Sequence, residues 1–293
     1  MRLTKRFLAF IIFAVAALVG CGDPNVEIDD SQYQPKIVVE GYLFAGETVK
    51  DIKISRNFRI GEKVTIEGLR LDPVTNNVIV TLNDIPLSFD PITKSYYNNN
   101  IFVEYNKTYT IIISAVINGT SVTAKSVTTT PAKGFKLVNK DLGTIRYNID
   151  EGKFYYYSSP GTNFYAFSFL ADSASVNNFI YDNTLYPGLK PKEVQDNMNM
   201  FYYQGIFITD INSYQTTTFT YKLQPFDAWF YSKYRVIAYA GDQNFRSYVF
   251  TAKNVQEFDG NFHEPKILFV GDGIGVFASA IRDTATFTLV PAN

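Results

Sequence analysis

Cys21 and His263 are the only cysteine and the only histidine of this 293-residue chain. A nucleophilic residue usually needs a base beside it, and zinc is held mainly by cysteine and histidine side chains. Because Glu264 and Pro265 follow His263, this histidine fits a turn leading into a strand better than a catalytic base. We therefore expect no enzymatic activity, no metal and no cofactor. The residue at which we expect a covalent modification is Cys21.

The residues before Cys21 have the pattern of an export leader. An uncharged apolar run covers residues 7–19, and it follows three bases, Arg2, Lys5 and Arg6. A membrane-spanning helix needs about 20 apolar residues, so this shorter run fits the apolar region of a signal peptide. We expect residues 1–20 to be removed on export.

Residues 18–21 (Leu-Val-Gly-Cys) resemble the lipobox of bacterial lipoproteins, in which an apolar, a variable and a small residue precede the cysteine. The resemblance implies that the Cys21 thiol is diacylated, that cleavage occurs before it, and that three acyl chains, palmitate among them, give firm anchoring. The alternative is an ordinary secretory signal with an incidental cysteine. Acylation is favoured because it explains an unpaired cysteine in an exported chain.

Residues 21–34 are interpreted as an acidic tether. They contain Asp23, Glu27, Asp29 and Asp30 and no base, and no periodic pattern begins before Lys36. Acids just after a lipidated cysteine resemble the surface-export signals of Bacteroidetes lipoproteins. The resemblance implies a lipid anchor in the outer membrane with the body facing the cell surface, and the periplasmic face is the alternative.

The charge balance argues against nucleic acid as a partner. Lys and Arg number 27 and Asp and Glu 28, and loss of the leader removes three bases and no acid, which leaves a net charge of about −4. The chain has no long basic run that could neutralise a phosphate backbone. Aromatic residues make up 16% of the chain, and aromatic residues are favoured in strands.

The first domain is expected at residues 35–131 as an immunoglobulin-like β-sandwich. Apolar-rich or alternating patterns predict strands at residues 36–44, 51–56 and 77–82. A hairpin is predicted at Asn118-Gly119, because this pair accepts the positive φ angles of a type I′ turn. Its strands are expected at 107–117 and 120–128.

A linker is predicted at residues 128–134, followed by a second β-rich domain with one short helix at residues 135–293. The strongest strand patterns lie at 164–170, 214–221, 234–239 and 284–289. The helix is predicted at 242–253, with Asp242 as its N-cap and one apolar face formed by Phe245, Tyr248, Val249 and Ala252. The fold class is therefore mostly β, and the linker predicts that the two domains unfold separately.

Two other motifs are interpreted as turns. Residues 271–275 (Gly-Asp-Gly-Ile-Gly) lack the third glycine and the following helix of a dinucleotide fingerprint, so they predict a tight bend between strands. Residues 182–183 and 259–261 offer oxygen ligands for calcium without the spacing of an EF-hand. The two carboxylates of a glycoside hydrolase come together only in the folded protein and have no fixed spacing in the sequence. Such a pair therefore stays an open alternative.

Aromatic side chains are the candidate ligand-binding residues. Tyr155 and Tyr157 are expected on one face of a strand, whereas Tyr202, Tyr203 and Trp229 lie in a more irregular part of the second domain. Their rings can stack on sugars or cap an apolar pocket. Packing in the core or at a sheet edge is the alternative interpretation of all five.

Three segments together resemble the Bacteroidetes lipoproteins grouped as domain-of-unknown-function family 4249. They are residues 35–43 (PKIVVEGYL), residues 106–110 (NKTYT) and residues 259–278, within which 270–273 depart from the family's usual Asn-Ile-x-Gly. The family has no assigned reaction, and its members are often thought to accompany TonB-dependent receptors. The resemblance implies a non-enzymatic accessory or substrate-capture partner of a TonB-dependent receptor barrel.

The aromatic residues leave a second interpretation of the function open. A self-standing glycan-binding or adhesion module at the cell surface would use the same rings, with a glycan or a peptide as the ligand. A glycosidase is the third possibility. A gene for a TonB-dependent receptor beside this one would favour the first interpretation, and hydrolase genes alone would favour the others.

Overall fold

The computed structural model of the chain describes residues 33–59, 61–183, 187–201, 203–209, 219–224, 227–252 and 268–292. The expected signal peptide, Cys21 and most of the tether lie outside these residues. The chain divides into two compact units, Met1–Gln34 with Phe58–Lys63, and Pro35–Asn57 with Val64–Asn293. Within the first unit, the guanidinium of Arg59 lies 5.1 Å from the ring centre of Tyr33. The strands named below all belong to the second unit.

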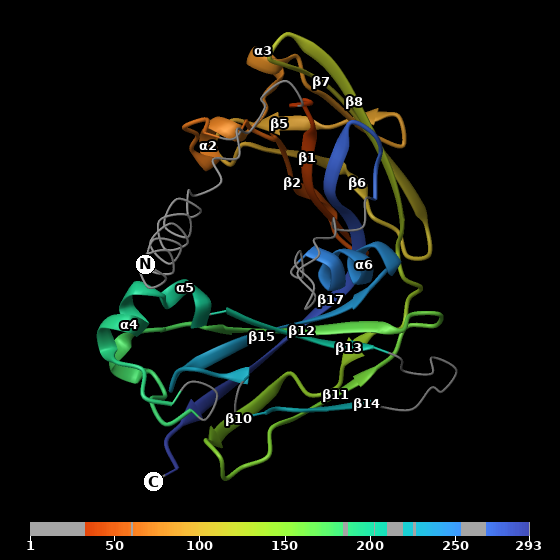
Figure 1. Cartoon of the computed structure of the whole chain (residues 1–293). Coiled ribbons are helices and arrows are strands. Elements are labelled where there is room, and N and C mark those ends of the chain that lie inside the picture. Colours follow the sequence, from red (N-terminus) through yellow and green to blue (C-terminus); the bar gives the residue numbers. More distant parts are fainter. Residues whose placement is uncertain are drawn as a thin grey trace, which may run out of the picture. The chain divides into compact units, whose positions relative to one another are not determined.

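The described strands of the second unit form three sheets (Figure 1). The largest has the order β13 (Tyr203–Thr209), β12 (Phe164–Ala171), β15 (Lys233–Gly241), β17 (Gly273–Val290), β1 (Ile37–Phe44), β2 (Thr48–Arg56), β6 (Ser95–Phe102) and β5 (Ser88–Asp90), and β10 (Asp141–Arg146) also pairs with β17. The second has the order β16 (Val270–Gly271), β8 (Thr120–Thr129), β7 (Thr108–Ile117), β3 (Ile79–Leu82) and β4 (Ile85–Pro86). The third has the order β14 (Phe219–Lys222), β11 (Lys153–Tyr157) and β9 (Lys136–Leu137).

Helices are short in the described part of the chain. They are α2 (Ile66–Leu69), α3 (Pro73–Asn76), the 3₁₀ turn η2 (Val176–Asn178), α4 (Pro191–Asp196), α5 (Met198–Phe201) and α6 (Gln243–Ala252). Among the described residues, none of them is long and apolar enough to cross a membrane. The expectation of a mostly β fold is confirmed.

The first half of the unit is an immunoglobulin-like β-sandwich, as expected. Strand β7 turns Tyr109, Ile111 and Ile113 inward in strict alternation, which is the period-2 pattern of a half-buried strand. Val39 of β1 and Ile52 of β2 are buried in the same apolar core from the other sheet. The two sheets therefore enclose a shared core between them, as in a sandwich.

The hairpin between β7 and β8 has the predicted turn. The ten residue pairs from Thr108↔Thr129 to Ile117↔Thr120 are in register, and the turn residues Asn118 and Gly119 have φ angles of 52° and 81°. Positive φ at both positions is the requirement of a type I′ turn. The local sequence therefore sets the register of the two longest strands of this sheet.

Replacing Gly119 with valine is expected to lower the free energy of unfolding by about 1–2 kcal/mol, the cost of holding a residue with a Cβ in the left-handed region. No other heavy atom lies within 4 Å of the Cβ position at Gly119, so the backbone conformation alone is tested. Urea unfolding of Gly119→Val measures the loss, and Gly119→Asn is the matched control, because asparagine tolerates this region. An unchanged stability of the valine variant would contradict the turn.

The second half of the unit is also a layered β structure. Strand β11 turns Phe154 and Tyr156 inward, where the Phe154 ring lies 6.0 Å from Phe167 of β12 and 6.2 Å from Phe287 of β17. Tilted and edge-on ring pairs of this kind stabilise a core beyond the area that they bury. The sheet of β14, β11 and β9 therefore covers one face of the large sheet.

Helix α6 is the short helix that the sequence predicts. The backbone N–H of Phe245 donates to Oδ1 of Asp242 at 2.9 Å, so Asp242 is the N-cap as expected. Helices α4 and α5 were not predicted, because six and four residues are too few to show an apolar period. The available signal for α4 was Pro191 at the first position and the Glu193 side chain, which accepts from the backbone N–H of Lys190.

Strand β17 joins the two halves, which the sequence did not predict. Its first part pairs in parallel with β1 from Gly273 to Ala280, and its second part pairs antiparallel with β15 from Ala280 to Thr288. The C-terminal strand therefore completes the N-terminal sheet across the expected linker at 128–134. The sequence predicts that residues 35–131 and 135–293 unfold separately. The pairing of β17 with strands of both halves favours a single cooperative transition instead.

Candidate functional site

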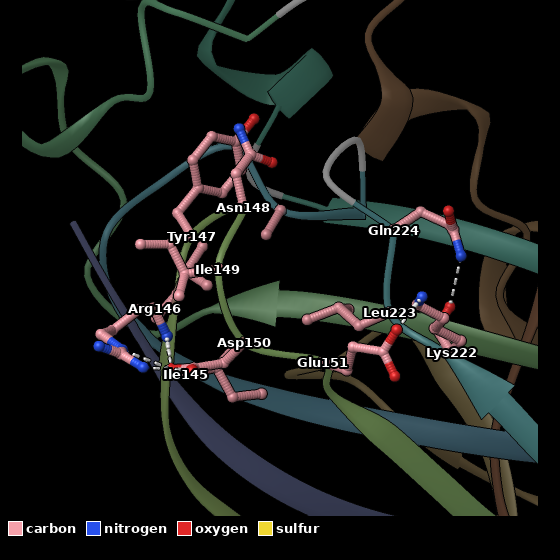
Figure 2. A pocket seen from close by; sticks show the side chains of 12 residues that line it. Ile145, Arg146, Tyr147, Asn148, Ile149, Asp150, Glu151, Lys222, Leu223 and Gln224 are labelled. Atoms are coloured by element: carbon pink, nitrogen blue, oxygen red, sulfur yellow. Dashed lines mark hydrogen bonds and ion pairs between the residues drawn. The ribbon is translucent and has the colours of Figure 1, made fainter. Parts of the chain in front are cut away.

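An open pocket of about 310 Å³ lies between the turn after β10 and the segment after β14. Figure 2 shows the side chains that line it, which come from residues 145–151, residues 222–224, Ala228 and Leu289. Apolar side chains form part of the wall, and charged and amide side chains form the rest. Mixed linings of this kind suit ligands that have both apolar and hydrogen-bonding faces.

Backbone hydrogen bonds fix the first wall of the pocket. The N–H of Tyr147 donates to the carbonyl of Val290 at 2.9 Å, and the N–H of Ile149 donates to the carbonyl of Arg146 at 3.1 Å. Asn148, between them, has a φ of 58°, a conformation that asparagine tolerates better than most residues. These hydrogen bonds therefore fix the backbone of the turn that forms this wall.

The second wall is joined to the first at Gly152. The N–H of Leu223 donates to the Gly152 carbonyl at 2.8 Å, and a Cβ at Gly152 would lie 2.8 Å from Cδ1 of Ile145. Only glycine leaves room for this close approach. The amide of Gln224 donates to the Lys222 carbonyl at 3.0 Å, as Figure 2 shows.

Two groups of ion pairs line the pocket. Arg146 donates from Nε and Nη2 to the two carboxylate oxygens of Asp150 at 2.9 and 2.7 Å, and these hydrogen bonds lower the pKa of Asp150 to about 2. Glu151 accepts from Lys153 at 2.7 Å and also from Lys222. Hydrogen bonds from these two ammonium groups lower the pKa of Glu151 to about 2. Both acids are therefore ionised at neutral pH.

A tyrosine face adjoins this pocket, and we define it as the outward side chains of Tyr155, Tyr157 and Lys153 on β11 with their cross-strand neighbours Lys222 and Lys136. Tyr155 is 40% and Tyr157 44% exposed. Lys153 pairs with Lys222 of β14, and Tyr157 pairs with Lys136 of β9. Paired residues of antiparallel strands lie on one face, so Lys222 belongs both to the pocket and to the tyrosine face.

The five sequence candidates have three different outcomes. Tyr155 and Tyr157 share an exposed face, as expected. Trp229 is 3% exposed and lies against Phe179 and Phe201, with ring centres 5.9 and 5.2 Å away, which places it in the core and not on a surface open to a ligand. Tyr202 lies outside the described residues. Tyr203 opens β13, and its side chain lies outside the described part.

Sequence reasoning missed the charged and amide residues of the pocket. Arg146, Asp150 and Gln224 have no motif spacing, and Lys222 is 71 positions from Glu151, with which it pairs. The only local signal was the separation of Arg146 from Asp150 by four residues, which is common in surface turns. The fold, and not the local sequence, brings these groups together.

The glycine motif at residues 271–275 is only partly a bend. Gly271 ends β16, Asp272 is the bend, and Gly273 begins β17, in which Gly273 and Gly275 pair with β1. The expected bend between strands is therefore confined to Asp272, and a strand follows where a dinucleotide site needs a helix. Within the described residues, no group of three His, Cys, Asp or Glu side chains could hold a metal ion. His263 and residues 259–261 lie outside those residues.

Comparisons with known proteins give no family. No protein-family model matches the chain, and no curated protein matches it. Among solved structures, a chimeric titin Z1Z2 carrying an exogenous KLER peptide from decorin is 10% identical, with 88% of this chain and 97% of that chain covered and a TM-score of 0.23. The titin Z1Z2 domains in complex with telethonin are 10% identical, with 88% and 95% covered and a TM-score of 0.22. Both TM-scores are low, so neither likeness bears on the function of this chain.

Proposed function

We propose that this chain is a lipid-anchored, non-enzymatic outer-membrane protein that captures a ligand for a TonB-dependent receptor. The lipobox-like residues 18–21 and the acidic residues that follow Cys21 support the proposed location. The observation that carries the binding function is the continuity of the pocket with the tyrosine face through Lys222. The resemblance to family 4249 is part of this proposal and supplies the receptor as the partner.

The ligand of this site is a saccharide. Tyrosine rings offer apolar faces and a polar edge at low conformational cost, and residues two apart on a strand lie about 6.6 Å from each other. Arg146, Asn148 and Gln224 line the adjoining pocket with hydrogen-bonding groups. Hydroxyl groups on both edges of a sugar chain can use such donors and acceptors while its apolar face covers the tyrosines.

The electrostatics of the pocket support binding without catalysis. A glycosidase needs one carboxylic acid with a raised pKa to protonate the leaving group. Asp150 and Glu151 both have a pKa of about 2, and each is paired with a cation. Neither acid is suited to donate a proton at neutral pH, which argues against a glycosidase at this pocket.

Replacing both Tyr155 and Tyr157 with alanine is expected to weaken saccharide binding. Each ring contributes about 0.5–1.5 kcal/mol, so we expect Kd to rise about two- to tenfold for each ring removed. The measurement is titration against the polysaccharide that binds the wild type best on an array of bacterial and plant glycans. The double phenylalanine variant is the matched control, because it keeps the stacking faces. Equal Kd values for the alanine variant and the wild type would contradict the tyrosine face.

The transporter part of the proposal is tested by native purification of the tagged protein from outer membranes, followed by mass spectrometry. We expect a TonB-dependent receptor to co-purify in stoichiometric amount with the wild type. Purification without any such receptor, combined with saccharide binding on the array, would instead support a self-standing glycan-binding or adhesion module. The tyrosine face supports the self-standing module as well as it supports ligand capture for a receptor, because saccharide binding at this face needs no partner protein.

A further inference from the structure

Three apolar side chains are unusually exposed at one end of the first sandwich. Ile66 on α2, Val74 on α3 and Ile92 in the turn between β5 and β6 are 72%, 90% and 91% exposed. Single exposed apolar residues are normal on a soluble surface. Val74 lines one pocket, and Ile66 and Ile92 are next in sequence to Glu67 and Pro91, which also line it. The three side chains therefore need an explanation as a group, which we call the apolar tips.

The pocket among the apolar tips has a volume of about 730 Å³. Three cations line it, Arg56, Arg70 and Lys94, together with two acids, Glu67 and Asp72. Phe89, Pro91 and Val74 are among its apolar walls. The pocket therefore offers cations next to apolar surface, which fits a phosphate group that carries apolar chains.

The fold holds the apolar tips in place. Asp72 accepts from the N–H groups of Val74 and Thr75 at 2.8 Å each, and Asp90 accepts from the N–H of Ile92 at 2.9 Å. Tyr96 donates its hydroxyl to the Leu71 carbonyl at 3.2 Å. These hydrogen bonds fix the backbone at Val74 and Ile92, so the exposure of these two side chains belongs to the folded state.

The chain enters the sandwich at the same end. The N–H of Lys36 donates to the side chain of Asn57 at 2.8 Å, and Ile37, the first residue of β1, pairs with Arg56 of the pocket. Figure 1 shows α2 and α3 at the end of this sandwich away from α6. Pro35 is the fourteenth residue after Cys21, so at most about 50 Å of chain separates it from the anchor.

We propose that the apolar tips rest on the phospholipid surface that holds the anchor, with Ile66, Val74 and Ile92 at the acyl boundary and Arg56, Arg70 and Lys94 near lipid phosphates. This inference relies on the lipid anchor of the proposed function. Surface-bound proteins insert apolar side chains a short distance below the headgroups in this manner, and basic side chains nearby add attraction to anionic lipid. Contact at this end leaves the pocket and tyrosine face of the second half open to a ligand.

A label at two of the three tips tests the contact in the full-length lipidated protein. Once Cys21 is acylated, the cysteine of Val74→Cys or Ile92→Cys is the only free thiol, and it takes an environment-sensitive fluorophore. The labelled protein is reconstituted into vesicles of phosphatidylethanolamine and phosphatidylglycerol that contain a nitroxide-bearing lipid. Met200→Cys on α5 is the control, because Met200 is an apolar side chain that is 60% exposed in the second half of the unit.

We expect quenching at positions 74 and 92 to exceed quenching at position 200 by at least about twofold, since only the tips reach the acyl boundary. Equal quenching at the three positions, with palmitate present on Cys21, would overturn the lipid contact while the anchor stands. A further outcome is that, in native outer membranes, the cysteines at positions 74 and 92 are protected from reaction with the fluorophore although the labelled protein is not quenched in vesicles. That result would also overturn the lipid contact and would point to a protein on this surface. Absence of palmitate from the wild type would overturn both the anchor and the contact.

Discussion

Gly275→Ala is expected to destabilise the protein more than any other single substitution considered above. Gly275 has a φ of 100° and pairs with Val39 where β17 runs parallel to β1. A Cβ at this position would lie 2.2 Å from the Val39 carbonyl oxygen and 3.1 Å from the Val39 nitrogen. Both are backbone atoms of a central strand, so the clash can be relieved only by separating the two strands.

We expect a loss of about 4 kcal/mol or more in the free energy of unfolding, the range of exceptional substitutions. Urea unfolding followed by circular dichroism measures it, and Gly161→Ala is the matched control. Gly161 also has a positive φ, 74°, but no atom lies within 4 Å of its Cβ position, so only about 1–2 kcal/mol is at stake there. Equal losses for the two variants would contradict the close approach of β17 to β1.

The same experiment tests cooperativity. Because β17 belongs to both halves of the second unit, loss of its pairing with β1 should lower a single transition of the whole β body. Two unfolding transitions, of which Gly275→Ala shifts only one, would instead support two separate domains divided at residues 128–134, as the linker predicts.

Asp242→Ala is expected to have the second largest effect, a loss of about 3 kcal/mol. The Asp242 carboxylate accepts from the N–H of Phe245 at 2.9 Å, the N–H of Ser279 at 3.2 Å and the Thr128 hydroxyl. It therefore joins α6, β17 and β8 at one point. Alanine would remove the acceptor of the N–H groups of Phe245 and Ser279, at a cost of about 1–3 kcal/mol for each such group, whereas the Thr128 hydroxyl keeps its hydrogen bond to Ser279.

Asp242→Asn is the matched control and adds a test by pH. Burial raises the pKa of Asp242 above its ordinary value of 3.8, and the hydrogen bonds from Thr128, Phe245 and Ser279 oppose this only in part. For an acid with a raised folded pKa, the stabilisation is complete below the unfolded pKa and is lost as pH rises through the folded pKa. Asparagine cannot titrate, so its stability relative to the wild type should increase as pH rises from 3.8 through that folded pKa. A difference that stays constant with pH would contradict the burial of this carboxyl.

The elements that the sequence predicts are those with a local cause. The Asn118-Gly119 turn, the alternation in β7 and the Asp242 cap each depend on residues within a few positions, and each has the expected geometry. The pairing of β1 with β17 has no such mark, because parallel pairing joins residues as far apart as Ile37 and Gly273. The sequence pattern of β17 predicts a strand, but it does not predict which strands pair with it.

The candidate site divides in the same way. Tyr155 and Tyr157 share a face because the period of a strand is two residues, and this needs no knowledge of the fold. Trp229 is rare and aromatic, which made it a candidate, but its burial against Phe179 is decided by tertiary packing. The joining of Glu151 to Lys222 depends on the order of β14 and β11, which the sequence does not display.

The central claim, a lipid-anchored protein that works at the outer membrane, is tested most directly at Cys21, the only cysteine of the chain. Cells that express the wild type or Cys21→Ser are grown with labelled palmitate, and the label and the protein are followed through separated membrane fractions. We expect label on the wild type in the outer-membrane fraction and none on Cys21→Ser, because no other thiol can be acylated. Label that persists on Cys21→Ser, or a wild type without label, would contradict the account.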